Sequence, residues 1–222
     1  KPIKLNIHTI ILAGGKGTRM LSQKAKVLQA LGGRTMLNHV MTAANKISNK
    51  ISVVVGFDKG GVEEEIKKIG INANTYLQKE QIGTADAVKT TLKDIDKNEK
   101  ILILYGDVPL IKEETLEKLC NQESDLSILT TNLKNPTGYG RALKDKENNV
   151  LGIIEEKDAD LEQKKIKEIF TGILVTKGGV LKNFIPEIDN NNLAKEFYLT
   201  DLIGIAHKNG FKINTLSSSN EE

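Results

Sequence analysis

The feature that most constrains the fold is a buried strand that runs directly into a glycine-rich loop. Residues 9–12 form an uninterrupted β-branched and apolar run, which is typical of a parallel strand covered on both faces. The chain continues with Gly-Gly-Lys-Gly at 14–17. Glycines at this density let the backbone adopt unusual angles and approach a ligand closely. A binding site is therefore expected where this strand ends.

The loop also concentrates groups that bind anions. Lys16, Thr18 and Arg19 add two cations and a hydroxyl to the backbone N–H groups, a set suited to a phosphate chain. The loop lacks the Gly-Lys-Ser/Thr ending of a Walker A motif and the third glycine of the dinucleotide fingerprint. A tight structural glycine turn is the alternative. Lys26, which precedes an apolar piece expected to be extended, is either a solvated lysine or a further cation for the same phosphates.

Strand and helix patterns alternate through the first part of the chain. Apolar runs predict strands at 51–55, 73–77, 101–104 and 127–132, and helical periodicity predicts helices at 35–48, 62–69 and 85–92. This alternation predicts right-handed crossovers and an α/β fold with a three-layer, doubly wound sheet.

The pattern changes after a turn-rich loop that begins at Pro136. Paired short strands at 141–144 and 150–155 and an interrupted strand at 166–176 predict a smaller, mixed-sheet part packed against the first. Helices at 178–185 and 198–208 and a strand at 211–216 complete the chain. With no repeat or low-complexity linker in the sequence, one compact unit is expected.

Asp107 is the strongest candidate for a metal ligand. It follows the apolar run at 101–104 through Tyr105 and Gly106, and ligands of open parallel sheets bind at the carboxyl ends of strands. A carboxylate there suits Mg²⁺, which often takes one or two protein ligands and completes its shell with phosphates and water. The alternative is an aspartate that caps the next helix.

Polar residues in two other segments suggest contacts to a base and to a sugar. Gln78 and Gln81 carry amides that can read a base edge, and Gly83 and Thr84 stand at a predicted helix start with free N–H groups. Glu155 could accept hydrogen bonds from hydroxyls, with Gly140 offering an N–H group. For both the glutamine-containing segment and Glu155, the alternative is a polar residue on the solvated surface.

Composition excludes several classes of protein. The 222 residues carry a net charge of only +3 and 4% aromatic residues, which argues against a nucleic-acid-binding protein. The single cysteine, Cys120, excludes an internal disulfide and is expected to pack on an apolar helix face. No apolar run reaches the roughly 18 residues of a membrane span, and no signal-peptide core follows the N-terminus. A cytoplasmic protein with no membrane association is expected.

The motifs together resemble the uridyltransferase domains of bacterial N-acetylglucosamine-1-phosphate uridyltransferases. The matching strings are Leu12-Ala-Gly-Gly-Lys-Gly-Thr-Arg-Met20, Lys26-Val-Leu28, Gln81-Ile-Gly-Thr84, Tyr105-Gly-Asp-Val-Pro-Leu110, Pro136-Thr-Gly-Tyr-Gly-Arg141, Glu155-Glu-Lys-Asp158 and Thr171-Gly-Ile-Leu174. Their order and spacing hold from about residue 10 to the end.

The resemblance implies a Rossmann-like nucleotidyltransferase fold for 1–222, with a nucleotide-binding half at about 7–134 and a sugar-binding half at about 135–216. It implies that UTP and N-acetylglucosamine 1-phosphate give UDP-N-acetylglucosamine, a cell-wall precursor, and pyrophosphate, with Mg²⁺ on Asp107. The implied phosphate-binding and catalytic residues are Arg19, Lys26 and Asp107. The implied nucleotide-binding residues are Leu12, Ala13, Gly14, Gly15, Gln78, Gly83, Thr84, Tyr105 and Gly106. The implied sugar-binding residues are Gly140, Glu155, Phe170, Tyr198 and Thr200.

The chain departs from the family at a few places. Phe170 stands where the family has a sugar-contacting Asn, and Gly14 where it has Ala. The family's second metal ligand, an Asn, falls beyond Glu222, as does the C-terminal β-helix acetyltransferase domain through which the family forms a trimer. Two other functions stay open. Phe170 favours transfer to another phosphate, such as glucose 1-phosphate. A nucleotide-sugar-binding module without turnover would not need the metal and phosphate groups.

Overall fold

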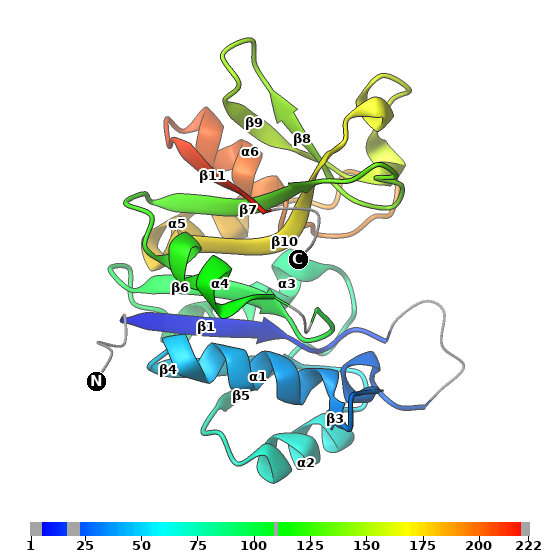
Figure 1. The fold of residues 1–222 in the computed structure, drawn as a ribbon, viewed down its shortest axis with the longest axis vertical. Coiled ribbons are helices and arrows are strands. Elements are labelled where there is room, and N and C mark those ends of the chain that lie inside the picture. Colours follow the sequence, from blue (N-terminus) through cyan, green and yellow to red (C-terminus); the bar gives the residue numbers. More distant parts are fainter. Residues whose placement is uncertain (1–5, 17–22, 109–110, 219–222) are drawn as a thin grey trace.

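One sheet organises the computed structural model, which describes residues 6–16, 23–108 and 111–218 (Figure 1). Nine of the described strands join this sheet in the order β11-β7-β10-β6-β1-β4-β5, with β8 and β9 attached through β10. The strands on this path are β1 (Ile7–Leu12), β4 (Lys50–Val55), β5 (Asn74–Leu77), β6 (Lys100–Tyr105), β7 (Leu126–Asn132), β10 (Glu168–Lys177) and β11 (Ile213–Ser218). The attached hairpin is β8 (Arg141–Lys144) and β9 (Val150–Ile154), and a separate small sheet pairs β2 (Ala30–Leu31) with β3 (Arg34–Thr35).

The centre of the sheet is parallel, as the alternating pattern predicts. β1 lies between β4 and β6 and runs parallel to both, and β5 runs parallel to β4. Every residue of β1 is buried, which agrees with a strand covered on both faces. Its side chains alternate between the two faces, so that Ile10 belongs to one hydrophobic core and Ile11 to the other.

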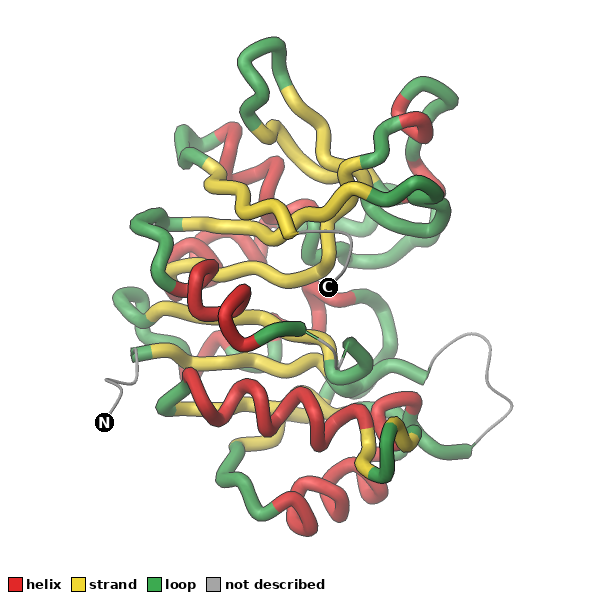
Figure 2. The backbone as a smooth tube through the Cα atoms, viewed as in Figure 1, coloured by secondary structure: helices red, strands yellow, loops and turns green. Residues whose placement is uncertain are grey.

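Helices cover both faces of the sheet and make the three predicted layers, as Figure 2 shows in red in front of and behind the strands. The core around Ile11 receives side chains from α1 (Met36–Ile47), α2 (Lys59–Ile69) and α4 (Glu113–Cys120). The core around Ile10 receives them from α3 (Thr84–Lys89), α5 (Gly178–Phe184) and α6 (Asp201–Lys208). Short 3-10 helices are η1 (Lys26–Leu28), η2 (Leu92–Asp94), η3 (Glu156–Asp158), η4 (Gln163–Lys165) and η5 (Ile185–Glu187).

Side-chain caps set the start of the first two helices. Thr35 caps α1, as predicted, because its Oγ1 accepts a hydrogen bond from the Asn38 N–H group at 3.1 Å. Asp58 caps α2 by accepting from the Gly61 N–H group at 3.2 Å, so this helix begins earlier than the predicted residue 62. Gly70 ends α2 with a φ of 76°, the left-handed conformation for which glycine is suited.

The last helix begins later than predicted. It starts at Asp201 rather than at 198. The Leu199 N–H group donates to Thr84 Oγ1 at 2.8 Å, so a contact with α3 replaces the first helical turn. Tyr198 and Thr200 therefore lie in the segment that connects to the helix.

Strand β10 joins the second part of the chain to the sheet of the first. It lies between β6 and β7 and is antiparallel to both. Its register with β7 shifts between Phe170 and Leu174, and Gly172 there has a φ of 91°, which accounts for the predicted interruption. The antiparallel β10 and the β8–β9 hairpin supply the mixed pairing expected of this part, within the same sheet.

The remaining expectations from composition concern the membrane and the cysteine. No helix in the described part of the chain is long and apolar enough to cross a bilayer. Cys120, at the end of α4, is 1% exposed, and burial raises the pKa of its thiol to about 12. A buried thiol of this kind is a packing residue rather than a nucleophile.

The fully buried His8 of β1 couples stability to pH. Its Nε2 lies 2.7 Å from Ser52 Oγ and its Nδ1 lies 3.2 Å from Glu99 Oε1. Burial lowers the pKa of His8 below its usual 6.5, although the Glu99 carboxylate opposes this shift. The folded protein therefore holds His8 largely as the neutral imidazole.

We predict that the free energy of unfolding falls as the pH drops below about 6.5, because the unfolded chain binds the His8 proton more readily than the folded chain does. This contribution is complete above the unfolded pKa and is lost on acidification. Urea unfolding of the protein and of His8→Gln, at about pH 7.5 and about pH 5.5, measures it. The variant should show a smaller difference between the two pH values, and an equal difference would contradict the prediction.

Candidate active site

A cleft of about 460 Å³ opens at the carboxyl ends of β1 and β6. This is the position where open parallel sheets bind ligands. The residues that line it come from the end of β1 and the glycine-rich loop, the 3-10 helix η1, the segment from β5 into α3, the end of β6, and the segment before α6. They are Leu12, Ala13, Gly14, Gly15, Lys16, Lys26, Val27, Gln78, Gln81, Gly83, Thr84, Ala87, Tyr105, Asp107 and Glu196.

Backbone contacts hold the described part of the glycine-rich loop in the cleft. The Phe57 N–H group donates to the Gly14 carbonyl oxygen at 3.0 Å, and the Gly106 N–H group donates to the Leu12 carbonyl oxygen at 2.9 Å. A Cβ at Gly106 would lie 2.8 Å from Val27 Cγ1, so glycine is needed for the end of β6 to approach η1. Thr18 and the predicted phosphate ligand Arg19 lie outside the described residues.

Lys26 and Asp107 meet across the cleft. Lys26 Nζ lies 2.9 Å from Asp107 Oδ2, and the two side chains are 43% and 28% exposed. Lys26 begins the 3-10 helix η1, where an extended piece was predicted. The ion pair holds a cation and a carboxylate beside the glycine-rich loop.

Gln78 presents an oxygen rather than a donor to the cleft. Its side chain is 4% exposed, and its Nε2 donates to the Gly83 carbonyl oxygen and to Asp86 Oδ2, both at 3.0 Å. A Cβ at Gly14 would lie 3.3 Å from Gln78 Oε1. The amide is thus fixed with its oxygen toward the glycine-rich loop, where it can accept a hydrogen bond from a ligand.

Thr84 and Tyr105, both predicted to bind the nucleotide, connect different parts of the cleft wall. Thr84 Oγ1 accepts from the Leu199 N–H group at 2.8 Å. Burial raises the pKa of the Tyr105 phenol, which stays neutral, and the nearby Thr84 side chain opposes this shift. A Cβ at Gly172 would lie 2.7 Å from the Tyr105 ring, so β10 packs directly against this wall.

Four of the five predicted sugar-binding residues are linked by contacts that the structure shows. Thr200 Oγ1 donates to Glu155 Oε1 at 2.9 Å, and a Cβ at Gly140 would lie 3.6 Å from the same oxygen. The Phe170 N–H group donates to the Gly140 carbonyl oxygen at 2.9 Å. The Phe170 side chain is 5% exposed and belongs to the hydrophobic core.

Several carboxylates lie around the predicted sugar-binding residues. Burial raises the pKa of Glu155, and the hydrogen bond from Thr200 partly offsets the increase. Burial and the carboxylates of Asp158, Glu155 and Glu196 raise the pKa of Tyr198 to about 12, which places this phenol among them. Carboxylates beside a phenol provide hydrogen-bond acceptors for hydroxyl groups.

Three cleft residues were missed by the sequence reasoning, namely Val27, Ala87 and Glu196. Val27 could have been predicted to line the cleft, because it follows Lys26 directly in the sequence. Ala87 carries no chemical signal because it is a small residue of α3. Glu196 comes from a distant segment, which is held beside the cleft by hydrogen bonds such as that from the Phe197 N–H group to the Ile82 carbonyl oxygen at 2.8 Å.

Two carboxylates, Asp107 and Glu196, line the cleft, and among the described residues they do not form part of a cage of metal ligands. The described residues contain no group of three or more His, Cys, Asp or Glu side chains placed to hold one. Asp107 alone would suit Mg²⁺, because this ion keeps several waters and binds substrate phosphates directly. The donor set is therefore compatible with Mg²⁺ and unsuited to a structural zinc site.

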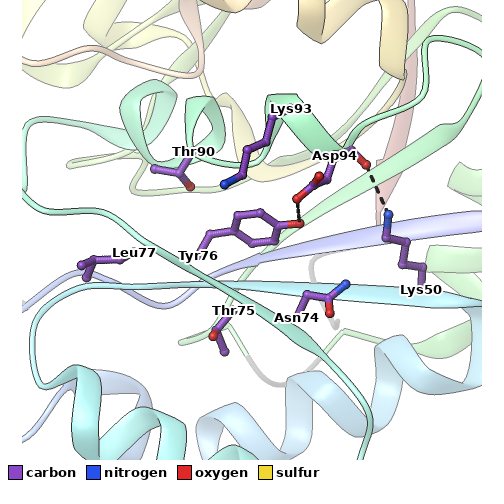
Figure 3. A pocket seen from close by; sticks show the side chains of 8 residues that line it. All are labelled: Lys50, Asn74, Thr75, Tyr76, Leu77, Thr90, Lys93 and Asp94. Carbon is purple, nitrogen blue, oxygen red and sulfur yellow. Dashed lines mark hydrogen bonds between the residues drawn. The ribbon is translucent and has the colours of Figure 1, made fainter.

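A larger hollow, of about 750 Å³, lies between β5 and the segment from α3 to η2 (Figure 3). Four of its polar or charged residues contact one another. The Tyr76 hydroxyl donates to Asp94 Oδ2 at 2.7 Å, Lys50 Nζ donates to the Asp94 carbonyl oxygen at 3.2 Å, and Lys93 Nζ lies 6.0 Å from the centre of the Tyr76 ring. The hollow also lacks the glycine-rich loop, so the smaller cleft is the better candidate active site.

A mostly parallel sheet with a glycine-rich loop after β1 and a carboxylate after β6 defines a nucleotidyltransferase-like α/β protein. Comparison of the sequence with protein families agrees, because the model of the MobA-like NTP transferase domain matches residues 9–159. The chain belongs to this family of NTP transferase domains.

Two relatives resemble nearly the whole chain. The bifunctional protein GlmU of Ruthia magnifica subsp. Calyptogena magnifica is 43% identical over 97% of the chain, and that of Buchnera aphidicola subsp. Schizaphis graminum is 42% identical over 98%. The matches cover 48% and 47% of those proteins, so the chain spans about half the length of the relatives it matches.

Solved structures share the fold. A protein described as a glucose-1-phosphate thymidylyltransferase, from Bacillus anthracis, superposes with a TM-score of 0.78 at 21% identity and covers 96% of this chain and 87% of its own. The inositol-1-phosphate CTP transferase from T. maritima superposes with a TM-score of 0.75 at 17% identity and covers 96% of this chain and 86% of its own. The Rossmann-like nucleotidyltransferase fold expected from the motifs is thereby confirmed.

We predict that Gly83→Ala destabilises the protein, while Gly15→Ala in the same cleft does not. Gly83 has a φ of 130°, and a Cβ there would lie 2.3 Å from the Phe197 carbonyl oxygen, whereas a Cβ at Gly15 would meet nothing within 4 Å. Strain of this kind costs about 1–3 kcal/mol, and an uncrowded substitution stays within about 0.5 kcal/mol. Thermal unfolding compares the two variants. Equal melting temperatures would show that the Phe197 segment does not hold Gly83.

Proposed function

We propose that this domain transfers UMP from UTP to N-acetylglucosamine 1-phosphate, producing UDP-N-acetylglucosamine and pyrophosphate. The observation that carries the proposal is the Lys26–Asp107 ion pair beside the glycine-rich loop, at 2.9 Å. Membership of the NTP transferase family and identity of 42–43% to proteins named GlmU support it. The motif resemblance supplies the identity of the two substrates.

The reaction is a displacement at the α-phosphorus of UTP. An oxygen of the sugar phosphate forms a bond to this phosphorus, and the bond from the phosphorus to the bridging oxygen breaks, so that pyrophosphate leaves with the bonding electrons. The protein needs no nucleophile of its own for this step. Its task is to hold the reactants in line and to offset the negative charge that develops on the phosphate oxygens.

The described cations and the carboxylate of the cleft suit this task. Lys16 and Lys26 line the cleft beside the glycine-rich loop and would neutralise the triphosphate, together with Arg19. Asp107 would hold Mg²⁺, which when bound would supply positive charge shared between phosphate oxygens. Lys26 pairs with Oδ2 of Asp107 at 2.9 Å, so it lies close enough to the proposed metal site to contact the same phosphates.

Contacts to the uracil would come from the segment around Gln78, and contacts to the sugar from the group around Glu155. Gln78 would accept a hydrogen bond from the base through Oε1, because both its described donations go to Gly83 and Asp86. Glu155, held by Thr200, would accept from a sugar hydroxyl. Gly140 would let the sugar approach the backbone.

One observation favours an acceptor substrate other than N-acetylglucosamine 1-phosphate. Phe170 is an apolar core residue at the place where the motif resemblance expects a sugar-contacting Asn. Loss of that amide removes a partner for the acetamido group. Transfer to glucose 1-phosphate, which lacks the acetamido group, is therefore the alternative.

The first experiment measures pyrophosphate release from UTP and Mg²⁺ with N-acetylglucosamine 1-phosphate, with glucose 1-phosphate and with no acceptor. We expect release chiefly with the acetamido sugar. Faster release with glucose 1-phosphate would replace the main proposal with the alternative. Binding of UTP without release for either acceptor would favour a nucleotide-sugar-binding module.

We predict that Lys26→Met and Asp107→Asn each reduce kcat/KM for UTP by about 10²–10³-fold, because each removes a charge from the reacting phosphates. Lys46→Met is the matched control. Lys46 makes a comparable surface ion pair with Glu113 at 3.3 Å, and this pair does not line the cleft. The control should keep its activity, and a similar loss in all three variants would indicate a general effect on folding.

A further inference from the structure

The turn after β4 contacts the glycine-rich loop and also the segment just before Lys26. The Phe57 N–H group donates to the Gly14 carbonyl oxygen at 3.0 Å, and Lys16 Nζ lies 5.1 Å from the centre of the Phe57 ring, within range of a cation–π interaction. The next residue, Asp58, accepts a hydrogen bond from the Ala25 N–H group at 3.0 Å. The dipeptide Phe57-Asp58 therefore contacts Lys16 in the glycine-rich loop and the backbone of Ala25, just before Lys26.

Asp58 does more than cap a helix. Its Oδ1 accepts from the Gly61 N–H group at 3.2 Å and caps α2, while its Oδ2 accepts from Ala25. A Cβ at Gly61 would lie 2.6 Å from both carboxylate oxygens, so glycine at this place leaves room for the carboxylate. The two oxygens are thus divided between the helix and the segment that leads to Lys26.

The backbone of Asp58 is unusual for a helix cap. Its φ is 54° and its ψ is 42°, whereas Thr35 caps α1 with a φ of −66° and a ψ of 156°. The left-handed conformation is disfavoured for residues with a Cβ, and capping alone does not require it. Such conformations persist where the surrounding structure imposes them, often near functional sites.

The contact with Ala25 bears directly on Lys26. Ala25 is fully buried and Val27 is 4% exposed, so the chain on either side of Lys26 is fixed in the protein interior. Val27 also lies against the end of β6 at Gly106. The Lys26 side chain is the part that reaches Asp107 in the cleft.

We propose that Asp58 is a positioning residue for the transferase reaction, which acts by fixing the backbone from which Lys26 reaches the phosphates. The inference rests on the proposed function of the site. Asp58 does not line the cleft. Its effect on turnover passes through Lys26, and its loss leaves the reacting groups present but wrongly placed.

The test compares Asp58→Gly with Thr35→Gly. Asp58→Gly keeps the left-handed backbone accessible and removes both acceptors, whereas Thr35→Gly removes the cap of a helix outside the cleft. We expect kcat to fall about 10–100-fold in Asp58→Gly and to stay near the original value in Thr35→Gly. Asp58→Asn, which keeps one carbonyl acceptor and tolerates this conformation, should recover part of the loss. Equal kcat in the two glycine variants would overturn the proposal.

A double variant separates positioning from a general structural effect. If Asp58 acts through Lys26, adding Asp58→Gly to Lys26→Met should lower kcat little further, because the group it positions is already gone. A merely structural role predicts that the full loss is repeated in the Lys26→Met background. That result would overturn the proposal.

A readout without turnover keeps this inference distinct from the proposed function. The Lys26 ammonium can be labelled by reductive ¹³C-methylation. Its NMR signal is the one that disappears in the spectrum of Lys26→Met. Its chemical shift should move on Asp107→Asn, and Asp58→Gly should produce a similar movement toward the shift of a solvated lysine. An unchanged Lys26 signal in Asp58→Gly would overturn the positioning role. Absence of any transferase activity, with the Lys26 signal moved as expected, would instead count against the proposed function alone.

Discussion

The parallel pairing of β1 with β6 is the constraint on which the rest of the site depends. It places Leu12 opposite Tyr105 in the register of the two strands, so both strands end at the same edge of the sheet. The glycine-rich loop leaves from one strand and Asp107 follows the other. Because the Gly106 N–H group donates to the Leu12 carbonyl oxygen at 2.9 Å, the pairing extends one residue past the strand and fixes the two segments that face the cleft.

The site is also divided by charge. Lys16 and Lys26 lie beside the glycine-rich loop, where a triphosphate would need cations. Other carboxylates collect around Glu155, and burial together with Asp189, Glu155 and Asp158 raises the pKa of Asp201 to about 6. A ligand with phosphates at one end and hydroxyl groups at the other matches this division.

Contacts over long distances in the sequence unite the two halves of the chain around the cleft. Strand β10 inserts between β6 and β7, and its Gly172 lies against the Tyr105 ring. The backbone at Phe197 and Leu199 is hydrogen-bonded to the segment around Thr84. The sugar-binding residues predicted in the second half are therefore attached to the cleft wall around Thr84 and Tyr105 by hydrogen bonds and by close packing.

The sequence by itself determined the alternating strands and helices, the cap of α1 by Thr35 and the chemistry carried by the glycine-rich loop, Lys26 and Asp107. These features depend on local patterns and on residue types, which can be read along the chain. Only the tertiary structure decided that β10 would enter the centre of the sheet, that Gln78 would use its amide donors internally, and that Asp58 would reach Ala25. It also brought Glu196 into the cleft and Phe170 into the core. Each of these depends on partners that are distant in sequence, and pairing between distant segments is settled by packing of the whole chain rather than by local preference.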